Sequence, residues 1–324
     1  MRDGKLDFFK CYLILSVVLG HCLNIFCTVE NGLHCLLRTF DLPMFMYISG
    51  YLLKGSIERY DWKQLILNKI TTIIFPAVIW MLVSLLCGDR CFYYFLWAIF
   101  ASSAIVTITH ICFKNKTLEL VVLCVTALLF HLIPKNIVNI SYLFPFFIFG
   151  YFSQNISTIS KVKGVVSLLT FIVLFIFVWD SSYNIWNTGG YILSNSIYVA
   201  KAVFLRILIG VAGIYTATFI LGHIYDCSKN NNIMNLTLRI GKETLSIYLV
   251  QHIVVEIGLA LLIKYLNINR LISEHFLLFG YVVAPIVALT LLLVMYYIVA
   301  LIKNYKWTKW MFGFKLSLKN LNCI

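Results

Sequence analysis

Long apolar runs follow one another along almost the whole chain, and they limit its fold more than any other feature. Each run has about the 20 residues that a helix needs to cross a bilayer. Hydrophobic residues make up 61% of the 324 positions and charged residues only 12%, with a mean hydropathy of +0.90. This composition lies outside the range of soluble domains. The sequence therefore predicts an all-α polytopic membrane protein whose helices form one bundle.

The apolar runs suggest about ten transmembrane helices. They cover residues 8–27, 34–54, 70–87, 91–113, 118–134, 137–153, 164–180, 200–224, 244–266 and 275–302. The fifth and sixth runs are short and interrupted by proline or glycine, so either could be a tilted or re-entrant segment. We predict a single transmembrane domain over residues 1–324, in which 303–324 form a short basic tail.

The distribution of basic residues predicts the orientation of the chain, because cytoplasmic loops retain Lys and Arg. With the amino terminus inside the cell, all but seven of the 26 Lys and Arg residues fall on the cytoplasmic side. We expect both termini to be cytoplasmic and the protein to span the cell membrane several times. This asymmetry and the attraction to anionic membrane lipids account for the net charge of +13, so we expect no nucleic-acid partner.

The first apolar run, which includes "LILSVVLGHC", carries ionisable residues on one face. Lys10 and His21 are eleven residues apart, which is about three helical turns plus 20° and roughly 16 Å along the axis. Asp7 lies one turn before Lys10 on that face. Ionisable groups at membrane depth are costly and often functional. The alternative is structural: Asp7 and Lys10 form an interfacial ion pair, and His21 bonds a neighbouring helix.

The second run, "RTFDLPMFMYISGYLL", also carries polar residues. Arg38 and Asp41 lie near its outer end, and Pro43 predicts a kink. Near the inner end, Gly50 allows a close helix contact or a break, and Ser49 can bond back to a helical carbonyl. Taken alone, the run is explained by a kink and by packing.

Several segments together resemble the membrane-bound acyltransferase-3 family. "LDFFKCYLILSVVLGH" is similar to the family's opening signature, a basic residue followed after ten positions by histidine. "DLPMFMYISGYLL" resembles its second helix. "LWAIFA", "YLFPFFIFGYF" and "IGKETLSIYLVQH" resemble later signatures in the same order. The chain departs from the family's usual pattern by having Lys10 where arginine is common, and Lys69 with Thr72 where two basic residues are common.

The resemblance implies transfer of an acyl group, usually acetyl, from a cytoplasmic acyl-CoA to a hydroxyl of an extracytoplasmic or lipid-linked carbohydrate. His21 then acts as general base or as transient acyl carrier, since imidazole can do both. Lys10, Lys69 and Asp7 are the expected donor-binding residues. Acetyl-CoA is a substrate in this scheme, and no tightly bound cofactor is expected.

Five further polar residues within the runs are candidates for acceptor binding or support. These candidates are Arg38, Asp41, Ser49, His252 and Glu256. His252 and Glu256 share a helix face at i, i+4, where they orient one another, line an acceptor cavity or form a structural hydrogen bond. Arg206 near a helix end is expected to reach the interface. The ten cysteines are scattered singly without metal-ligand spacing, so no metal is expected.

Two other classes of protein stay open at this stage. A polytopic transporter or flippase for a lipid-linked sugar or a small solute would also carry buried charges along its pathway. It would not need Lys10 and His21 on one face, and we find no internal repeat of the kind many transporters have. A signalling membrane protein is the other alternative, but no sensor or effector domain is evident.

Overall fold

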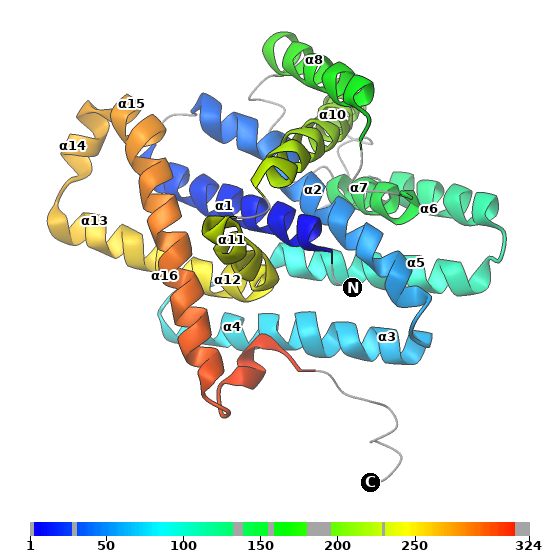
Figure 1. The fold of residues 1–324 in the computed structure, drawn as a ribbon, viewed down its shortest axis with the longest axis horizontal. Coiled ribbons are helices and arrows are strands. Elements are labelled where there is room, and N and C mark those ends of the chain that lie inside the picture. Colours follow the sequence, from blue (N-terminus) through cyan, green and yellow to red (C-terminus); the bar gives the residue numbers. More distant parts are fainter. Residues whose placement is uncertain are drawn as a thin grey trace. The chain divides into compact units, whose positions relative to one another are not determined.

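Helices are the regular secondary structure of the chain wherever its structure is described. The computed structural model describes residues 3–27, 31–131, 139–154, 159–179, 196–228 and 231–314, and within these ranges it contains no strand. Figure 1 shows the helices along the chain. The predicted all-α fold class is therefore confirmed.

The helices fall into two compact units whose segments alternate along the sequence. The first unit comprises residues 1–41, 76–92 and 221–313, and the second comprises 42–75, 93–220 and 314–324. Three helices continue from one unit into the other: α2 (Gly32–Ile57), α4 (Phe75–Leu86) and α10 (Ser196–Ser228). The single domain expected from the sequence stays a prediction.

The first unit is built around α1 (Gly4–Phe26). Its other helices are α11 (Asn232–Lys242), α12 (Thr244–Gln251), α13 (Ala260–Leu266), α14 (Asn269–Glu274), α15 (Phe276–Leu278) and α16 (Ala284–Asn304), with π-helical segments η3 (His252–Leu259) and η4 (Phe279–Val283) and a 3-10 turn η5 (Lys309–Phe312). α1 packs against α11, α12, η3 and α16, as Figure 1 shows for α11 and α16. Buried side chains such as Phe9, Leu13 and Ile14 line α1 and form its part of the core.

Two local features fix the helices around α1. The Asp3 side chain accepts a hydrogen bond from the backbone N–H of Lys5 and so caps the first turn of α1. In α11, Gly241 lies directly against the backbone of Asp7, and a Cβ at this position would overlap the Asp7 carbonyl oxygen. Only glycine permits so close an approach of the two helices.

The second unit contains α3 (Trp62–Lys69), the π-helical segment η1 (Ile70–Ile74), α5 (Tyr94–Cys112), α6 (Lys116–Phe130), α7 (Ile140–Phe152) and α8 (Lys161–Phe177). Helices α5, α6 and α7 contact one another and share a polar cluster around the buried carboxylate of Glu119. The Tyr151 hydroxyl donates to Glu119 Oε1 over 2.9 Å, and His110 Nδ1 lies 3.2 Å from the same oxygen. These bonds compensate the cost of burying a carboxylate.

Helices α2 and α7 cross at a pair of glycines. A Cβ on Gly50 would overlap the carbonyl oxygen of Phe147, and a Cβ on Gly150 would overlap that of Tyr47. The two backbones are therefore in direct contact within the second unit. Of the two roles that the sequence left open for Gly50, the structure shows the close contact, since α2 continues through this position.

We expect Gly150→Ala to destabilise the protein by about 3 kcal/mol, because the backbone opposite cannot move away as a flexible side chain would. The matched control is Gly55→Ala on α2, where the nearest atom to an added Cβ is the mobile end of Arg59. The thermal midpoint of the purified protein in detergent measures the effect. Equal midpoints for the two variants would contradict the tight crossing.

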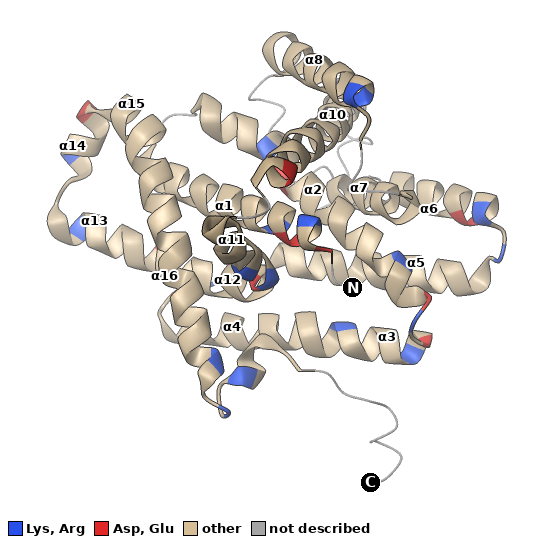
Figure 2. Cartoon of the chain, viewed as in Figure 1, with Lys and Arg blue, Asp and Glu red and all other residues tan. Residues whose placement is uncertain are grey.

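Among the described residues, six helical segments are long and apolar enough to cross a membrane. They are Gly4–Phe26, Trp62–Leu86, Tyr94–Cys112, Lys201–Ser228, Thr244–Leu266 and Phe276–Asn304. Figure 2 shows α16 uncharged until its carboxyl end, as a membrane span requires. A multi-pass membrane protein is thereby supported.

The remaining four predicted spans are not confirmed. The runs at 118–134, 137–153 and 164–180 correspond to α6, α7 and α8, which have 15, 13 and 17 residues. Helix α2 has 26 residues, but it carries charged residues and is not among the candidate spans. The count of ten and the cytoplasmic position of both termini stay predictions.

Candidate active site

His21 lies in the last two turns of α1, and a carboxylate faces it. Its Nδ1 lies 2.6 Å from Oε1 of Glu256, which belongs to η3. The His21 side chain is 31% exposed and that of Glu256 is 36% exposed, so both are accessible to a small molecule. No residue in the described ranges hydrogen-bonds Nε2 of His21. The His21 ring is therefore fixed by a contact at Nδ1, which leaves Nε2 for a substrate.

Glu256 contacts two imidazoles at once. Its second oxygen, Oε2, lies 2.8 Å from Nδ1 of His252 on the same helical segment. The i, i+4 contact between His252 and Glu256 is therefore present, and it belongs to a π-helical stretch rather than to a regular α-helix. π-Helical turns are frequent at functional sites. Sequence spacing suggested this pair but could not show that it reaches His21.

His252 is also paired with a residue that the sequence did not single out. Its Nε2 lies 3.0 Å from Oδ2 of Asp89, in the connection between α4 and α5. The Cys91 side chain lies near the ring as well. Asp89 lies in a loop with ordinary turn residues, so no local sequence pattern identifies it as a site residue. Only the folded chain brings it next to His252.

Helix α2 brings a further imidazole close to His21. His34 lies beside Gly20, and its Nε2 accepts a 2.6 Å hydrogen bond from Nε of Arg38. Nη2 of Arg38 lies 3.5 Å from Oδ1 of Asn24 on α1. The candidate acceptor residue Arg38 is therefore positioned by two groups next to the site. His34 was missed because it stands near the predicted start of the second run.

The contact between Lys10 and Asp7 that the structural alternative describes is present. Lys10 Nζ lies 3.6 Å from Asp7 Oδ1, and the Asp7 side chain is only 2% exposed. Asp7 is buried where Gly241 of α11 meets α1. This geometry fits both interpretations. The pair is either purely structural, or Asp7 orients the Lys10 cation towards a ligand. Asp41, another candidate acceptor residue, is buried in α2.

Two candidate residues belong to the second unit. Ser49 is half-buried on α2, one position before the glycine crossing. Lys69 ends α3 and lines a small pocket whose other residues come from α3 and α5: Leu65, Ile66, Phe100, Ser103, Ala104 and Thr107. Within the second unit, Lys69 therefore shares this pocket with two polar residues of α5, Ser103 and Thr107.

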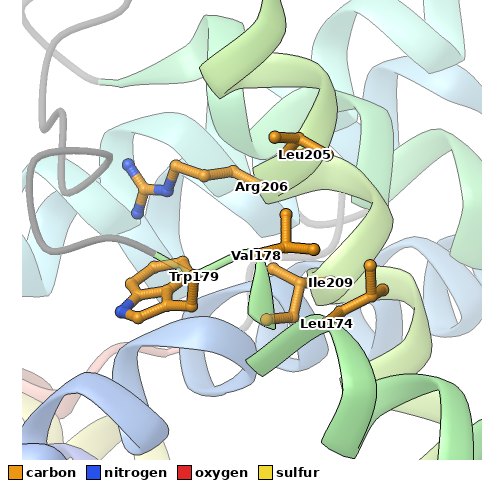
Figure 3. Close-up of a pocket in the computed structure, with 6 residues that line it drawn as sticks. All are labelled: Leu174, Val178, Trp179, Leu205, Arg206 and Ile209. Carbon is orange, nitrogen blue, oxygen red and sulfur yellow. The ribbon is translucent and has the colours of Figure 1, made fainter. Parts of the chain in front are cut away.

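Arg206 of α10 is buried rather than extended to the interface, which corrects the expectation from the sequence. Its guanidinium carbon lies 4.2 Å from the centre of the Tyr142 ring, a cation–π distance. Figure 3 shows Arg206 and Trp179 on the same side of a small pocket, with Leu174 and Leu205 across from them. Stacking on an aromatic ring compensates part of the cost of burying this charge.

The arrangement around His21 can move protons. A neutral imidazole that donates from Nδ1 to a carboxylate has its lone pair on Nε2, where it can accept a proton or attack an electrophile. The carboxylate also stabilises the imidazolium that proton transfer creates. Among the described residues, no group of three or more His, Cys, Asp or Glu side chains is arranged to hold a metal ion.

A histidine–carboxylate pair on membrane-length helices favours a membrane-bound enzyme of the group-transfer or hydrolytic kind. A comparison with family models is more specific, because the acyltransferase domain of the acyltransferase-3 type matches residues 3–305. The chain belongs to this family, and the resemblance noted in the sequence is confirmed.

Two curated relatives share this similarity. The chain is 26% identical over 285 residues to "Nodulation protein NolL" of Sinorhizobium fredii, which covers 77% of each chain. It is 24% identical over 283 residues to the protein of the same name from Mesorhizobium japonicum, covering 77% of this chain and 76% of the relative. No solved structure matches.

Family membership establishes the class of reaction. The protein is an acyltransferase, with an acyl donor and an acceptor as its substrates. This favours the enzyme over the transporter and signalling alternatives. The donor, the acceptor and the individual residue roles stay proposals.

Proposed function

We propose that the protein moves an acyl group, acetyl in the first place, from cytoplasmic acyl-CoA to a hydroxyl of an extracytoplasmic or lipid-linked carbohydrate at the cell membrane. The observation that carries this proposal is the 2.6 Å contact between His21 Nδ1 and Glu256. A hydroxyl is a poor nucleophile until a base removes its proton, and this contact gives His21 the orientation of a general base.

Each bond change can be assigned to a group. His21 Nε2 removes the proton of the acceptor hydroxyl as the oxygen attacks the thioester carbonyl. The new C–O bond forms, the C–S bond breaks, and the imidazolium returns its proton to the leaving thiolate. The alternative is attack by Nε2 itself, which produces an acyl-imidazole that the hydroxyl then cleaves. Both routes need the same tautomer, which Glu256 selects by accepting from Nδ1.

The activity is tested with purified protein in lipid vesicles, radiolabelled acetyl-CoA and a panel of methyl glycosides. We expect release of coenzyme A and transfer of label to at least one glycoside. Label on the protein without acceptor would indicate the acyl-histidine route. Absence of any thioester cleavage would contradict the proposed function.

Lys10 is proposed to contact the phosphates of the donor. It lies about 16 Å below His21 along α1, a separation that the extended arm of coenzyme A can span. A charge-assisted hydrogen bond contributes about 1.5 to 3 kcal/mol, so we expect Lys10→Ala to raise the KM for acetyl-CoA about 10- to 100-fold. The KM for the acceptor should change little. Initial rates at varied donor concentration measure the effect.

Because Asp7 is buried, removing Lys10 alone also leaves a buried carboxylate without this cation. The double variant Asp7→Asn/Lys10→Met removes both charges, and Lys10→Arg keeps the cation. If Lys10 binds the donor, the double variant keeps the raised KM and Lys10→Arg does not. A double variant with wild-type KM would show that Lys10 only neutralises Asp7.

A further inference from the structure

Asp89 is held in place by the way α4 ends. Gly88 has a φ of +86°, and the backbone N–H groups of Gly88 and Asp89 donate to the carbonyls of Leu85 and Ser84, over 3.0 and 3.1 Å. This is the Schellman arrangement, in which a left-handed glycine ends the helix. Oδ1 of Asp89 accepts the N–H of Arg90 over 2.7 Å. The local structure therefore fixes the carboxylate and leaves Oδ2 for His252.

The contacts form a continuous chain of four ionisable groups within one unit. Asp89 Oδ2 lies 3.0 Å from His252 Nε2, His252 Nδ1 lies 2.8 Å from one Glu256 oxygen, and the other Glu256 oxygen lies 2.6 Å from His21 Nδ1. Ionised carboxylates only accept hydrogen bonds, so each contact needs a hydrogen on the imidazole nitrogen. His252, which faces a carboxylate at both nitrogens, is then an imidazolium.

Asp89 keeps both hydrogens on the His252 ring. Its Oδ2 accepts from Nε2, and the second hydrogen, on Nδ1, is the one that Glu256 accepts. If His252 lost one of these hydrogens, a carboxylate would face a nitrogen lone pair. Asp89 and Glu256 are therefore linked through the same ring.

We infer that Asp89 is a positioning residue for acyl transfer: it holds His252 as the cation that fixes Glu256, and thereby orients the base His21. This inference rests on the proposed function. It assigns a role to the α4–α5 connection, which supplies no group that touches the reacting atoms. Asp89 acts only through His252, so its effect must disappear when His252 is replaced.

The test compares Asp89→Asn with wild type under the acetyl-CoA and methyl glycoside assay. Asparagine keeps the oxygen that accepts the Arg90 N–H and replaces Oδ2 with an NH2 group. It therefore removes both the charge and the acceptor that faces His252. We expect kcat to fall about 10-fold, the lower end for loss of a charge-assisted hydrogen bond at a half-exposed group. Both KM values should stay within about two-fold of wild type, and Asp89→Glu should restore part of kcat.

Two controls separate this role from a general structural one. Glu274→Gln removes a carboxylate of similar exposure in the same unit, 51% against 49%, which pairs with Arg270; it should keep wild-type kinetics. In a His252→Ala background, Asp89→Asn should have no further effect.

The outcomes distinguish the two proposals. Wild-type kinetics for Asp89→Asn, or an equal loss with and without His252, would overturn the positioning role while the acyltransferase activity stands. A wild-type protein that cleaves no acetyl-CoA would overturn the proposed function, and the positioning role with it.

Discussion

Replacing His21 with alanine is expected to lower the rate of acyl transfer by about 10²- to 10⁴-fold, the contribution of a positioned general base. The protein should fold as wild type does, since the ring is partly exposed and Glu256 keeps its contact with His252. The measurement is the initial rate of coenzyme A release at saturating acetyl-CoA and glycoside, with the thermal midpoint as a check on folding.

Two further variants make this result specific. His21→Gln keeps a hydrogen-bonding side chain and removes the base, so it should be as inactive as His21→Ala. His275→Ala removes an exposed histidine from the same unit and should keep full activity. Wild-type turnover in His21→Gln would exclude His21 as base and as acyl carrier.

Glu256→Gln should lower kcat about 10²-fold or more, with little change in the KM for the donor. The amide can donate to His21 Nδ1, which places the ring hydrogen on Nε2 and removes the lone pair that the acceptor hydroxyl needs. It also withdraws the negative charge that stabilises the imidazolium. Steady-state kinetics with acetyl-CoA measure both parameters. Glu256→Asp, which keeps the charge on a shorter side chain, should recover part of kcat.

The double variant His21→Ala/Glu256→Gln tests whether the two residues act as a unit. If Glu256 works only through His21, the double variant loses no more activity than His21→Ala. If the two losses multiply, Glu256 acts on the substrate by another route, and the assigned orientation of His21 is wrong.

Much of the site was predictable because its residues lie close together in sequence. Asp7, Lys10 and His21 share one face by helical geometry, and the structure shows the Asp7–Lys10 contact. His252 and Glu256 were expected to meet for the same reason, and they do. Within a helix, the backbone determines which residues are neighbours, so spacing alone is informative.

The number of membrane spans was less predictable from the sequence than the contacts within single helices. Hydropathy identified ten runs, but only six of the described helical segments are both long and apolar enough to be candidate spans. Helices α6, α7 and α8 have 15, 13 and 17 residues, fewer than the about 20 that a span needs. A run of apolar residues shows that a segment is excluded from water. It does not distinguish a full membrane span from a short helix that is buried against other helices.

The sequence by itself determined the class of protein, its family and its principal candidate residue, His21. These depend on composition, on the order of motifs and on spacing within single helices, which are local properties of the chain. Only the tertiary structure decided that Glu256 reaches His21 and that Asp89 reaches His252. These residues lie on separate elements, and their approach depends on contacts such as the glycine crossing of α1 with α11 and the left-handed Gly88. Sequence spacing cannot report such contacts, because packing between distant segments determines them.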